Sequence, residues 1–313
     1  MAMKFVFEFP HPQPGTAADP YRDAAAIARA AEAAGFAAIG FTDHPAPSAK
    51  WLDSVGHDSL DPFVAMAYCA AATSRIRVMS YVTIASYRNP LLLAKALASV
   101  DVLSGGRTIL GLSSGYLRSE FAALGADFGR RGRHLDETAE VLTRLWSSDT
   151  FQFSGLGFEA FDQVSRPAPV QLPHPPLWFA GNSDRVLERV ARWGQGWAPL
   201  LSDARQAQSV RSNTLSEADL SSRIAELRER LRQAGRPAAA VDVLVKGKPE
   251  HAPGQADEHN KVLAALGSSG VTAYSPVLGD RTPADVLSEI ARYGRETIGV
   301  VNPAAGVARH EVH

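Results

Sequence analysis

Two polar segments of the sequence carry side chains that are able to move protons. Asp43 and His44 stand side by side after an apolar run, and Glu120 follows Gly115 by five residues. Histidine is the most frequent general acid or base because its charge changes near neutral pH. Each segment also has a structural interpretation: His44 as a hydrogen-bonded turn residue, and Glu120 as a surface helix residue paired with an arginine. The residues alone leave both interpretations open.

The histidine segment could also belong to a metal site with His57, Asp58 and Asp61. Such a site needs ligands at suitable spacing, and neither His-x-His nor His-Glu-x-x-His occurs in the chain. The single cysteine, Cys69, excludes a cysteine-based zinc site and an internal disulfide. We therefore expect no bound metal, and we expect Cys69 to be buried and inert.

Gly181, Asn182 and Ser183 stand directly before a predicted helix and could bind an anion. A helix start offers free N–H groups and the positive end of the helix dipole. The alternative is an ordinary N-cap, in which Asn182 or Ser183 serves only the helix. The basic run over residues 130–134 could likewise clamp an anionic ligand or remain a solvated charge cluster.

The elements that must position these segments follow one repeating unit of helix, glycine and short apolar strand. Glycine just past a helix enters the left-handed region without steric cost. Strands that are apolar throughout fit a parallel sheet buried on both faces. The predicted strands are 4–8, 36–41, 75–83, 108–112, 176–180, 196–200, 241–246 and 271–274, and the predicted helices are 19–34, 61–73, 90–104, 133–147, 183–193, 216–234, 257–266 and 283–297.

Eight strand–helix units in 313 residues predict the α/β class and a (β/α)₈ TIM barrel. A doubly wound open sheet is the alternative, but it usually carries a Gly-rich fingerprint after the first strand, and residues 9–15 do not match one. No linker is evident. We expect one domain over residues 1–313, with excursions near 115–135, 148–175 and 246–256, the latter two as possible lids.

The polar residues follow the predicted strands and do not precede them. Residues 42–44, 86–89, 113–116 and 181–184 each come after a strand, whereas the joints leading into strands are mostly Gly, Ala and Ser. In a barrel the loops that follow the strands converge at one mouth. The sequence therefore predicts a functional site at the carboxyl ends of the strands.

Composition narrows the class of protein further. The chain is 45% hydrophobic with a formal net charge of −1, so it can build a large core and lacks the basic field of a nucleic-acid binder. No apolar run approaches the roughly 20 residues of a membrane span. The first residues, broken at Pro10, are too short for a signal peptide. We expect a soluble, cytoplasmic protein that binds neither nucleic acid nor membrane.

Four sequence blocks stand out along the chain: GFTDH at 40–44, YRNP at 87–90 with ASVDVLSGGR at 98–107, the segment from 110 to 137, and 175–183 with 191–197. Together they resemble the luciferase-like flavin-dependent oxidoreductases, the family of bacterial luciferase-like monooxygenases and their deazaflavin-using relatives. The resemblance covers roughly residues 4–200 in the family's order, and the last third of the chain matches weakly but keeps the alternation of strands and helices.

This resemblance implies a (β/α)₈ barrel that holds a flavin or deazaflavin at its carboxyl mouth. It implies catalytic roles for two residues: His44 would orient or protonate near the reacting atoms, and Glu120 would exchange a proton with substrate or ring. It also implies a non-proline cis peptide at the end of the third strand, placed at Tyr81-Val82. The implied cofactor-binding residues are Asp43, Tyr81, Val82, Thr83, Ser113, Ser114, Gly115, Ala180, Gly181, Asn182 and Ser183.

The acid/base segments look most like the branch that uses the 5-deazaflavin coenzyme F420. Bacterial luciferase has an arginine where this chain has Ser114, which disfavours FMN, whereas Ala180 departs from the two glycines usual at the phosphate turn. The resemblance implies hydride transfer between F420 and a small organic substrate. The alternatives are an FMNH₂-dependent luciferase-like monooxygenase and a non-catalytic flavin-binding protein.

The resemblance leaves the substrate open and suggests which residues surround it. Trp51, Asp53, His57 and Tyr87 are expected to face the substrate, and the arginines of the 130–134 run are candidate contacts to a phosphate or a tail. By analogy with the family we also expect a homodimer.

Overall fold

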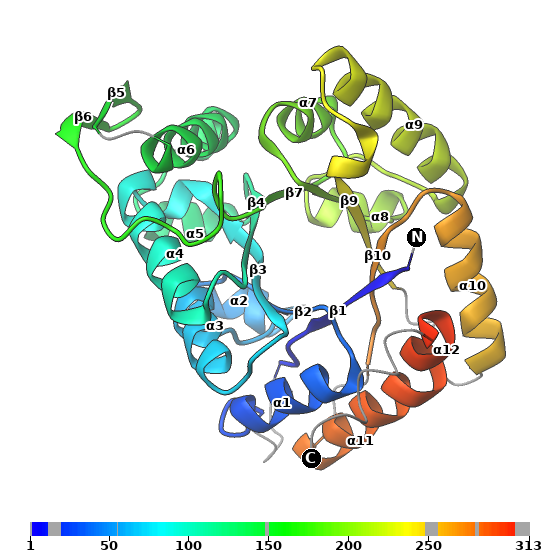
Figure 1. Ribbon diagram of the computed structural model, residues 1–313. Helices are drawn as coiled ribbons and strands as arrows, with labels where there is room; N and C mark the ends of the chain where they lie inside the picture. The colour runs from blue at the N-terminus through cyan, green and yellow to red at the C-terminus, as the bar shows by residue number, and fades with distance from the viewer. Residues whose placement is uncertain are drawn as a thin grey trace.

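A computed structural model describes residues 2–11, 20–54, 56–147, 150–247, 256–278 and 282–303. Within these residues eight parallel strands close into a barrel in the order β1-β10-β9-β8-β7-β4-β3-β2 (Figure 1). The predicted TIM barrel is confirmed. The barrel strands are β1 (Lys4–Glu8), β2 (Ala38–Phe41), β3 (Arg77–Ile84), β4 (Thr108–Ser113), β7 (Leu177–Ala180), β8 (Gly196–Ala198), β9 (Asp242–Lys246) and β10 (Ala273–Ser275).

Helices surround the strands and follow them along the chain (Figure 1). They are α1 (Ala24–Ala34), α2 (Ala49–Leu52), α3 (Pro62–Ala71), α4 (Pro90–Ser104), α5 (Arg118–Ala123), α6 (Arg131–Trp146), α7 (Asp184–Trp193), α8 (Ala204–Ser209), α9 (Glu217–Gln233), α10 (Ala256–Ser268), α11 (Pro283–Tyr293) and α12 (Gly299–Val301), with short 3₁₀ turns at Ala85–Tyr87, Phe128–Arg130 and Ala238–Ala240 and a π turn at Gly294–Ile298. The first helix begins later than predicted, because residues 20–23 form a turn before it.

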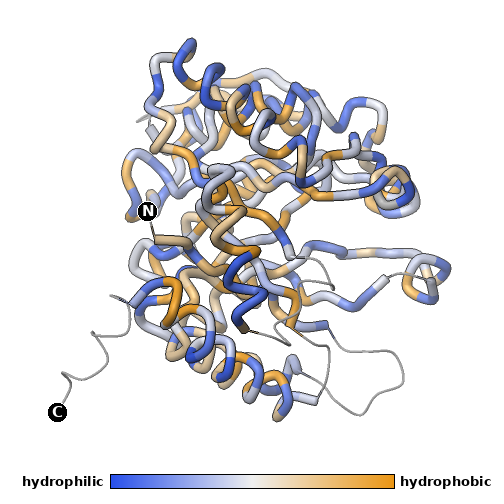
Figure 2. Tube along the Cα trace, turned by 90° about the vertical axis from the view of Figure 1, so that its right-hand side faces the viewer, coloured by the Kyte–Doolittle hydropathy of each residue, from blue (hydrophilic) through white to orange (hydrophobic). Residues whose placement is uncertain are grey.

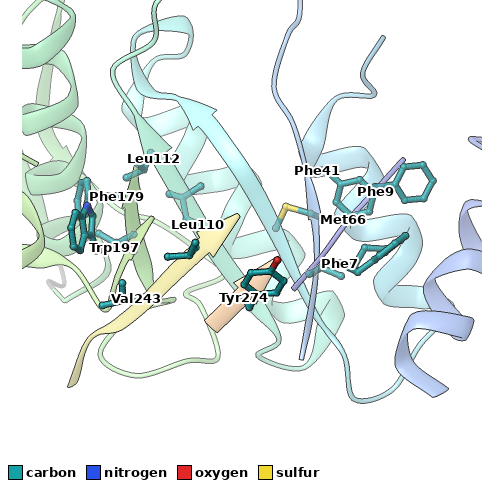
Figure 3. Close-up of a cluster of buried hydrophobic side chains, with 14 of the residues drawn as sticks. Phe7, Phe9, Phe41, Met66, Leu110, Leu112, Phe179, Trp197, Val243 and Tyr274 are labelled. Carbon is teal, nitrogen blue, oxygen red and sulfur yellow. The ribbon is translucent and has the colours of Figure 1, made fainter. Parts of the chain in front are cut away.

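The strands bury both faces, as their continuous apolar sequences predicted. Alternate residues of each strand point into the barrel, and the residues between them point outward against the helices. Leu110, Phe179 and Trp197 belong to the outer layer, part of which Figure 3 shows. The inner layer takes one side chain from each barrel strand: Val6, Ala38, Met79, Ile109, Trp178, Ala198, Leu244 and Ala273. This interior is therefore a packed core below the mouth of the barrel.

Several of the outer helices have one polar and one apolar face. In Figure 2 hydrophilic and hydrophobic residues alternate along these helices, which is typical of helices with one buried face. The left-handed glycines predicted to end helices are present after α1, where Gly35 has φ 93°, and after α4, where Gly105 has φ 67°.

The excursions contain structure that the sequence did not reveal. Residues 148–175 include an antiparallel hairpin of β5 (Phe151–Gly155) and β6 (Phe158–Gln163), which stands outside the barrel in Figure 1. The rings of Phe151 and Phe153 stack at 5.8 Å between centroids, and those of Phe153 and Phe158 at 5.5 Å. Strands this short give little periodicity, so the hairpin was missed. Most of the third excursion, residues 248–255, lies outside the described residues.

Candidate active site

A cavity of about 400 Å³ opens at the carboxyl ends of β1, β2, β3, β4, β7, β8 and β9. This is the mouth to which the pattern of polar residues pointed, and the volume is typical of a site for a cofactor or small ligand. The cavity lining includes Glu8, Thr42, Asp43, His44, Tyr81, Val82, Ser113, Ser114, Gly115, Tyr116, Arg131, Ala180, Gly181, Asn182, Ser183, Arg189, Arg211, Ser212, Asn213 and Lys246.

The two predicted acid/base residues meet at this cavity. His44 lines it, and its Nδ1 lies 3.2 Å from Oε2 of Glu120. The Tyr87 hydroxyl donates to the same oxygen at 3.0 Å, and the Ala46 N–H donates to Oε1 at 2.9 Å. Glu120 is 0% exposed and does not line the cavity. Its carboxylate therefore reaches the cavity through His44, and not directly as the resemblance implied.

The surroundings of Glu120 favour its charged form. Burial by itself raises the pKa of this carboxyl, but the hydrogen bonds with His44, Ala46 and Tyr87 outweigh it and hold the pKa below its usual range. Because an ionised carboxylate only accepts, Nδ1 of His44 must donate. Neutral His44 then carries its lone pair on Nε2, for which the described residues offer no hydrogen-bond partner.

Asp43 holds the ends of two strands together. Both oxygens of its carboxylate accept from Arg88, at 2.5 and 2.9 Å, and Oδ2 also accepts from the Ile84 N–H at 3.0 Å. Arg88 donates further to Asp61 at 3.1 Å. A buried bidentate pair of this kind fixes the loop that carries His44 against the end of β3. Asp43 borders the cavity, but its negative charge is already paired with the Arg88 guanidinium.

Aromatic rings pack around His44 on the remaining sides. The rings of Trp51 and Tyr116 lie 4.4 and 6.2 Å from the His44 ring, and His57 lies 5.5 Å away and stacks on His11 at 3.7 Å. Trp51 and His57 are not part of the cavity lining, nor are Asp53 and Tyr87, which were expected to face the substrate. Trp51 and His57 instead support the imidazole, and Tyr87 supports it through Glu120.

An ion pair that the sequence did not suggest also lines the cavity. Lys246 Nζ lies 2.5 Å from Glu8 Oε2. Burial by itself raises the pKa of Glu8, but the Lys246 ammonium outweighs it and holds the pKa below its usual range. Each residue is the last of its strand, β1 or β9. The barrel rule that selects strand ends could therefore have identified both.

The third strand and the loop after the fourth form another wall. The Tyr81–Val82 peptide bond is cis, as the resemblance implied, and the register with β4 shifts between Ser80 and Thr83. Beyond this shift Thr83 pairs with Leu112, is fully buried and does not line the cavity. The prediction that Thr83 contacts a cofactor is therefore not supported by this geometry, whereas Tyr81, Val82 and the 113–115 segment do border the cavity.

The turn before α7 offers backbone donors to the cavity. Ser183 is the N-cap of α7 and its side chain makes no capping hydrogen bond. Within the described chain the N–H groups of Asn182 and Ser183 donate to no acceptor, whereas the Gly181 N–H donates to Ala198 O at 3.1 Å. Gly181 has φ 121°, a conformation that a side chain would strain. This turn can hold a phosphate at the helix start.

Asn182 has a structural task that its motif did not reveal. Its amide nitrogen donates to the carbonyls of Leu200 and Asn213, both at 2.7 Å, and its amide oxygen accepts from the Leu200 N–H at 2.9 Å. The side chain thus ties the turn to the segment that follows β8. Asn182 borders the cavity, so it can contribute its backbone N–H there while its amide fixes the loop.

The arginines of the cavity differ from the expected set. Arg131 lines it, but Arg130 pairs with Asp127 and Arg133 with Glu137, both outside the cavity. Arg189, which the sequence did not single out, also lines the cavity and pairs with Asp136 at 2.6 Å. Arg211 lines it as well and comes from a segment without any motif, so no sequence signal could have identified it.

The residues present fit a flavin or deazaflavin. The cavity combines small or flat wall residues with one turn of free N–H groups, and the Thr42 hydroxyl on its wall is buried without a partner in the part of the chain that the structure describes. Asp43 and Asp61 both bind Arg88, and no set of three or more His, Cys, Asp or Glu among the described residues is grouped to hold a metal. Across those same residues, no helix is long and apolar enough to cross a membrane.

Comparison with curated proteins finds relatives whose names refer to two different cofactors. The chain is 33% identical over 186 residues to the F420-dependent hydroxymycolic acid dehydrogenase of Mycobacterium tuberculosis, a match covering 58% of this chain and 50% of that protein. It is 29% identical over 175 residues to the FMNH₂-dependent dimethylsulfone monooxygenase of Pseudomonas putida, covering 55% and 46%. The chain thus matches about half the length of these relatives.

Solved structures share the fold at lower identity. The monooxygenase RslO1 from Streptomyces bottropensis has a TM-score of 0.76 at 21% identity, covering 95% of this chain and 99% of that one. An F420-dependent secondary alcohol dehydrogenase has a TM-score of 0.73 at 17% identity, covering 97% and 99%. The family model described as luciferase-like monooxygenase matches residues 2–297. With a closed barrel and its polar residues at one mouth, this match shows that the chain belongs to the luciferase-like monooxygenase family.

Proposed function

We propose that this protein is an F420-dependent oxidoreductase that transfers a hydride between the deazaflavin and a small organic substrate. The observation that carries the proposal is the hydrogen-bonded array of Tyr87, Glu120 and His44, which ends on an imidazole in the cavity wall. Hydride transfer between carbon atoms of an alcohol or carbonyl and a cofactor leaves one proton to be moved at the substrate oxygen. This array is built to move that proton.

His44 is the catalytic residue of this proposal. Nε2 accepts the hydroxyl proton when an alcohol is oxidised and returns it to oxygen when a carbonyl is reduced. Glu120 is a positioning residue: its charge selects the tautomer of His44 and stabilises the imidazolium that forms when Nε2 takes the proton. Tyr87 and the Ala46 N–H keep that carboxylate ionised and in place.

The remaining wall would hold the cofactor. Tyr81, Val82 and the 113–115 segment border the space for a flat ring, and the free N–H groups at Ser183 face the same cavity and suit a phosphate. The bound deazaflavin would supply the two-electron hydride chemistry. The similarity to a dehydrogenase named as F420-dependent supports this cofactor.

An FMNH₂-dependent monooxygenase on the same barrel is the second candidate, favoured by the similarity to the dimethylsulfone monooxygenase. Anaerobic titration of the purified protein with F420 and with reduced FMN distinguishes the two. We expect F420 to bind at least tenfold more tightly and its absorbance to fall when a probe alcohol such as 2-propanol or cyclohexanol is added. Tight binding of reduced FMN with no binding of F420 would contradict the proposal.

A non-catalytic flavin-binding protein would use the cavity without the acid/base array. His44→Ala removes the imidazole and leaves the ring wall and the phosphate turn unchanged. We expect this variant to bind F420 with unchanged affinity and to lose turnover by about 10²–10⁴-fold, the range of a general acid or base. Equal turnover in the variant and the wild type would favour the non-catalytic alternative.

A further inference from the structure

Three guanidinium groups gather around one ring at the edge of the cavity. Arg118 and Arg131 lie 4.1 and 4.0 Å from the centroid of Phe128, and Arg211 lies 5.8 Å from it. They come from three separate segments: the first residue of α5, the first residue of α6 and the loop after α8. We refer to Arg118, Arg131 and Arg211 as the Phe128 arginine cluster.

No carboxylate of the described residues neutralises this cluster. Among the residues that the structure describes, none of the three arginines forms an ion pair, whereas nearby Arg189 is paired with Asp136. Burial and then the charges of Arg118 and Arg211 lower the pKa of Arg131. A cation on an aromatic face gains only a small stabilisation at an exposed site. The ring organises the cluster, and its positive charge is left to attract an anion.

The cluster extends from the inside of the cavity to its outside. Arg131 and Arg211 line the cavity together with Ser183, and Arg118 is exposed and lies beyond the lining. Arg211 has φ 52°, an uncommon backbone conformation for a residue with a side chain and one that concentrates at binding sites. A single phosphate held at the start of α7 would not span this path. The geometry fits a ligand that carries several anionic groups along a chain leaving the cavity.

We propose that the Phe128 arginine cluster binds the carboxylates of the acidic tail of F420, an inference that rests on the proposed function. In F420 the ribityl phosphate continues through a lactyl group into a chain of glutamates, whereas FMN ends at its phosphate. The turn at Ser183 would take the phosphate, and the cluster would take the carboxylates that follow. The cluster then contributes to the choice of cofactor as well as to its affinity, because FMN has no carboxylates beyond its phosphate for the arginines to bind.

The test compares ligands that share a ring and differ beyond it. Fluorescence titrations in the absence of substrate measure the affinity of the wild type for F420 and for its tail-free, phosphate-free deazaflavin fragment, and calorimetry measures riboflavin and FMN. The exposed arginines allow the double variant Arg118→Gln/Arg211→Gln, and Arg192→Gln is the matched control because Arg192 lies on the Trp193 ring, 4.3 Å from its centroid. Arg192 does not line the cavity.

We expect the double variant to bind F420 about tenfold more weakly, because it loses about two ion pairs and each contributes a few-fold to the affinity. Its affinity for the deazaflavin fragment and for FMN should stay within twofold of the wild type. The wild-type advantage of F420 over the fragment should shrink as salt is raised from 0.05 to 0.5 M. The Arg192 control should match the wild type throughout.

Each contrary result has a separate meaning. Equal loss of FMN and F420 affinity in the double variant would show that the cluster binds the phosphate, and no loss for either would remove it from cofactor binding. A loss confined to the KM of an acidic substrate would assign the cluster to that substrate. All three outcomes overturn the inference and leave the proposed function standing. Failure of the wild type to bind either deazaflavin would instead overturn the proposed function and the inference with it.

Discussion

The two carboxylate oxygens of Glu120 accept three hydrogen bonds, and its negative charge stabilises the imidazolium of His44. Glutamine in its place keeps the size of the side chain and removes the charge. We expect Glu120→Gln to lower kcat about 10²–10³-fold while KM and F420 affinity change less than threefold, because the imidazolium loses its counter-charge and the cavity lining is unchanged. Steady-state kinetics and F420 titration measure the two effects separately.

Tyr87→Phe is the matched control for this change. It removes one donor and keeps the carboxylate, so we expect a loss in kcat below tenfold. If both variants lost affinity for F420 in proportion to kcat, Glu120 would be a general structural residue and not a positioning residue for His44.

His11 carries a different prediction because burial and then neighbouring His57 lower its pKa to about 4, against the opposing effect of Glu8. In the unfolded chain the pKa returns to about 6.5. Between these values the unfolded state binds more protons, so the free energy of unfolding falls as pH falls. His11 should account for roughly 2 kcal/mol of loss between pH 7.5 and 5.

Urea unfolding of the wild type and His11→Asn at several pH values measures this contribution. The variant should show a shallower fall in the free energy of unfolding over the same range. His57→Asn should change the dependence in the same direction, since burial also lowers the pKa of His57. Identical slopes for wild type and His11→Asn would refute the assignment.

At the scale of elements, Asn182 determines where the segment after β8 lies. Its amide joins the end of β7 to Leu200 and Asn213, and that segment places Arg211 and Ser212 in the cavity wall. Asn182→Ala leaves buried backbone groups unsatisfied, which costs about 1–3 kcal/mol each. We expect lower stability, weaker F420 binding and faster proteolytic cleavage within residues 199–215.

Ser183→Ala provides the comparison on the same turn. Its hydroxyl makes no capping hydrogen bond, so the free energy of unfolding should change by less than about 0.5 kcal/mol. Limited proteolysis and urea unfolding of both variants distinguish a local loop effect from a global one. Equal cleavage rates in Asn182→Ala and the wild type would show that other contacts hold the segment.

At the scale of the whole molecule, the expected homodimer remains a proposal. α3 packs beside α4, and both helices expose apolar side chains. Val64 and Tyr68 of α3 are 69% and 55% exposed, and Leu92 of α4 is 69% exposed. Exposed apolar side chains gathered in this way mark interaction surfaces. We expect light scattering after size exclusion to give twice the mass of one chain, and Val64→Glu/Tyr68→Glu to give a single chain.

Val300→Glu is the control for charge alone, because Val300 is also exposed but lies on α12. That variant should keep the mass of the wild type. A wild type that runs as a single chain at all concentrations would exclude the dimer, and a dimer unaffected by the α3 changes would place its interface elsewhere.

The sequence by itself determined the barrel and the place of its site. Continuous apolar strands separated by helices predict a sheet buried on both faces, and the inner and outer layers at positions such as Leu110 and Ile109 confirm it. The same pattern placed the polar residues at the strand ends, where the cavity lies. Local signals suffice for this prediction, because apolar runs that mark buried strands and residues that cap helices can be recognised within one short segment of the sequence.

Only the tertiary structure decided what the individual side chains do. It placed Glu120, 76 residues from His44 in sequence, behind the imidazole and gave it Tyr87 as a second partner. It also assembled Arg118, Arg131 and Arg211 around Phe128 from segments with no common motif. Which side chains become partners depends on how loops from different strands pack together at the mouth. The spacing of residues within one segment carries no information about the distance between side chains of different segments.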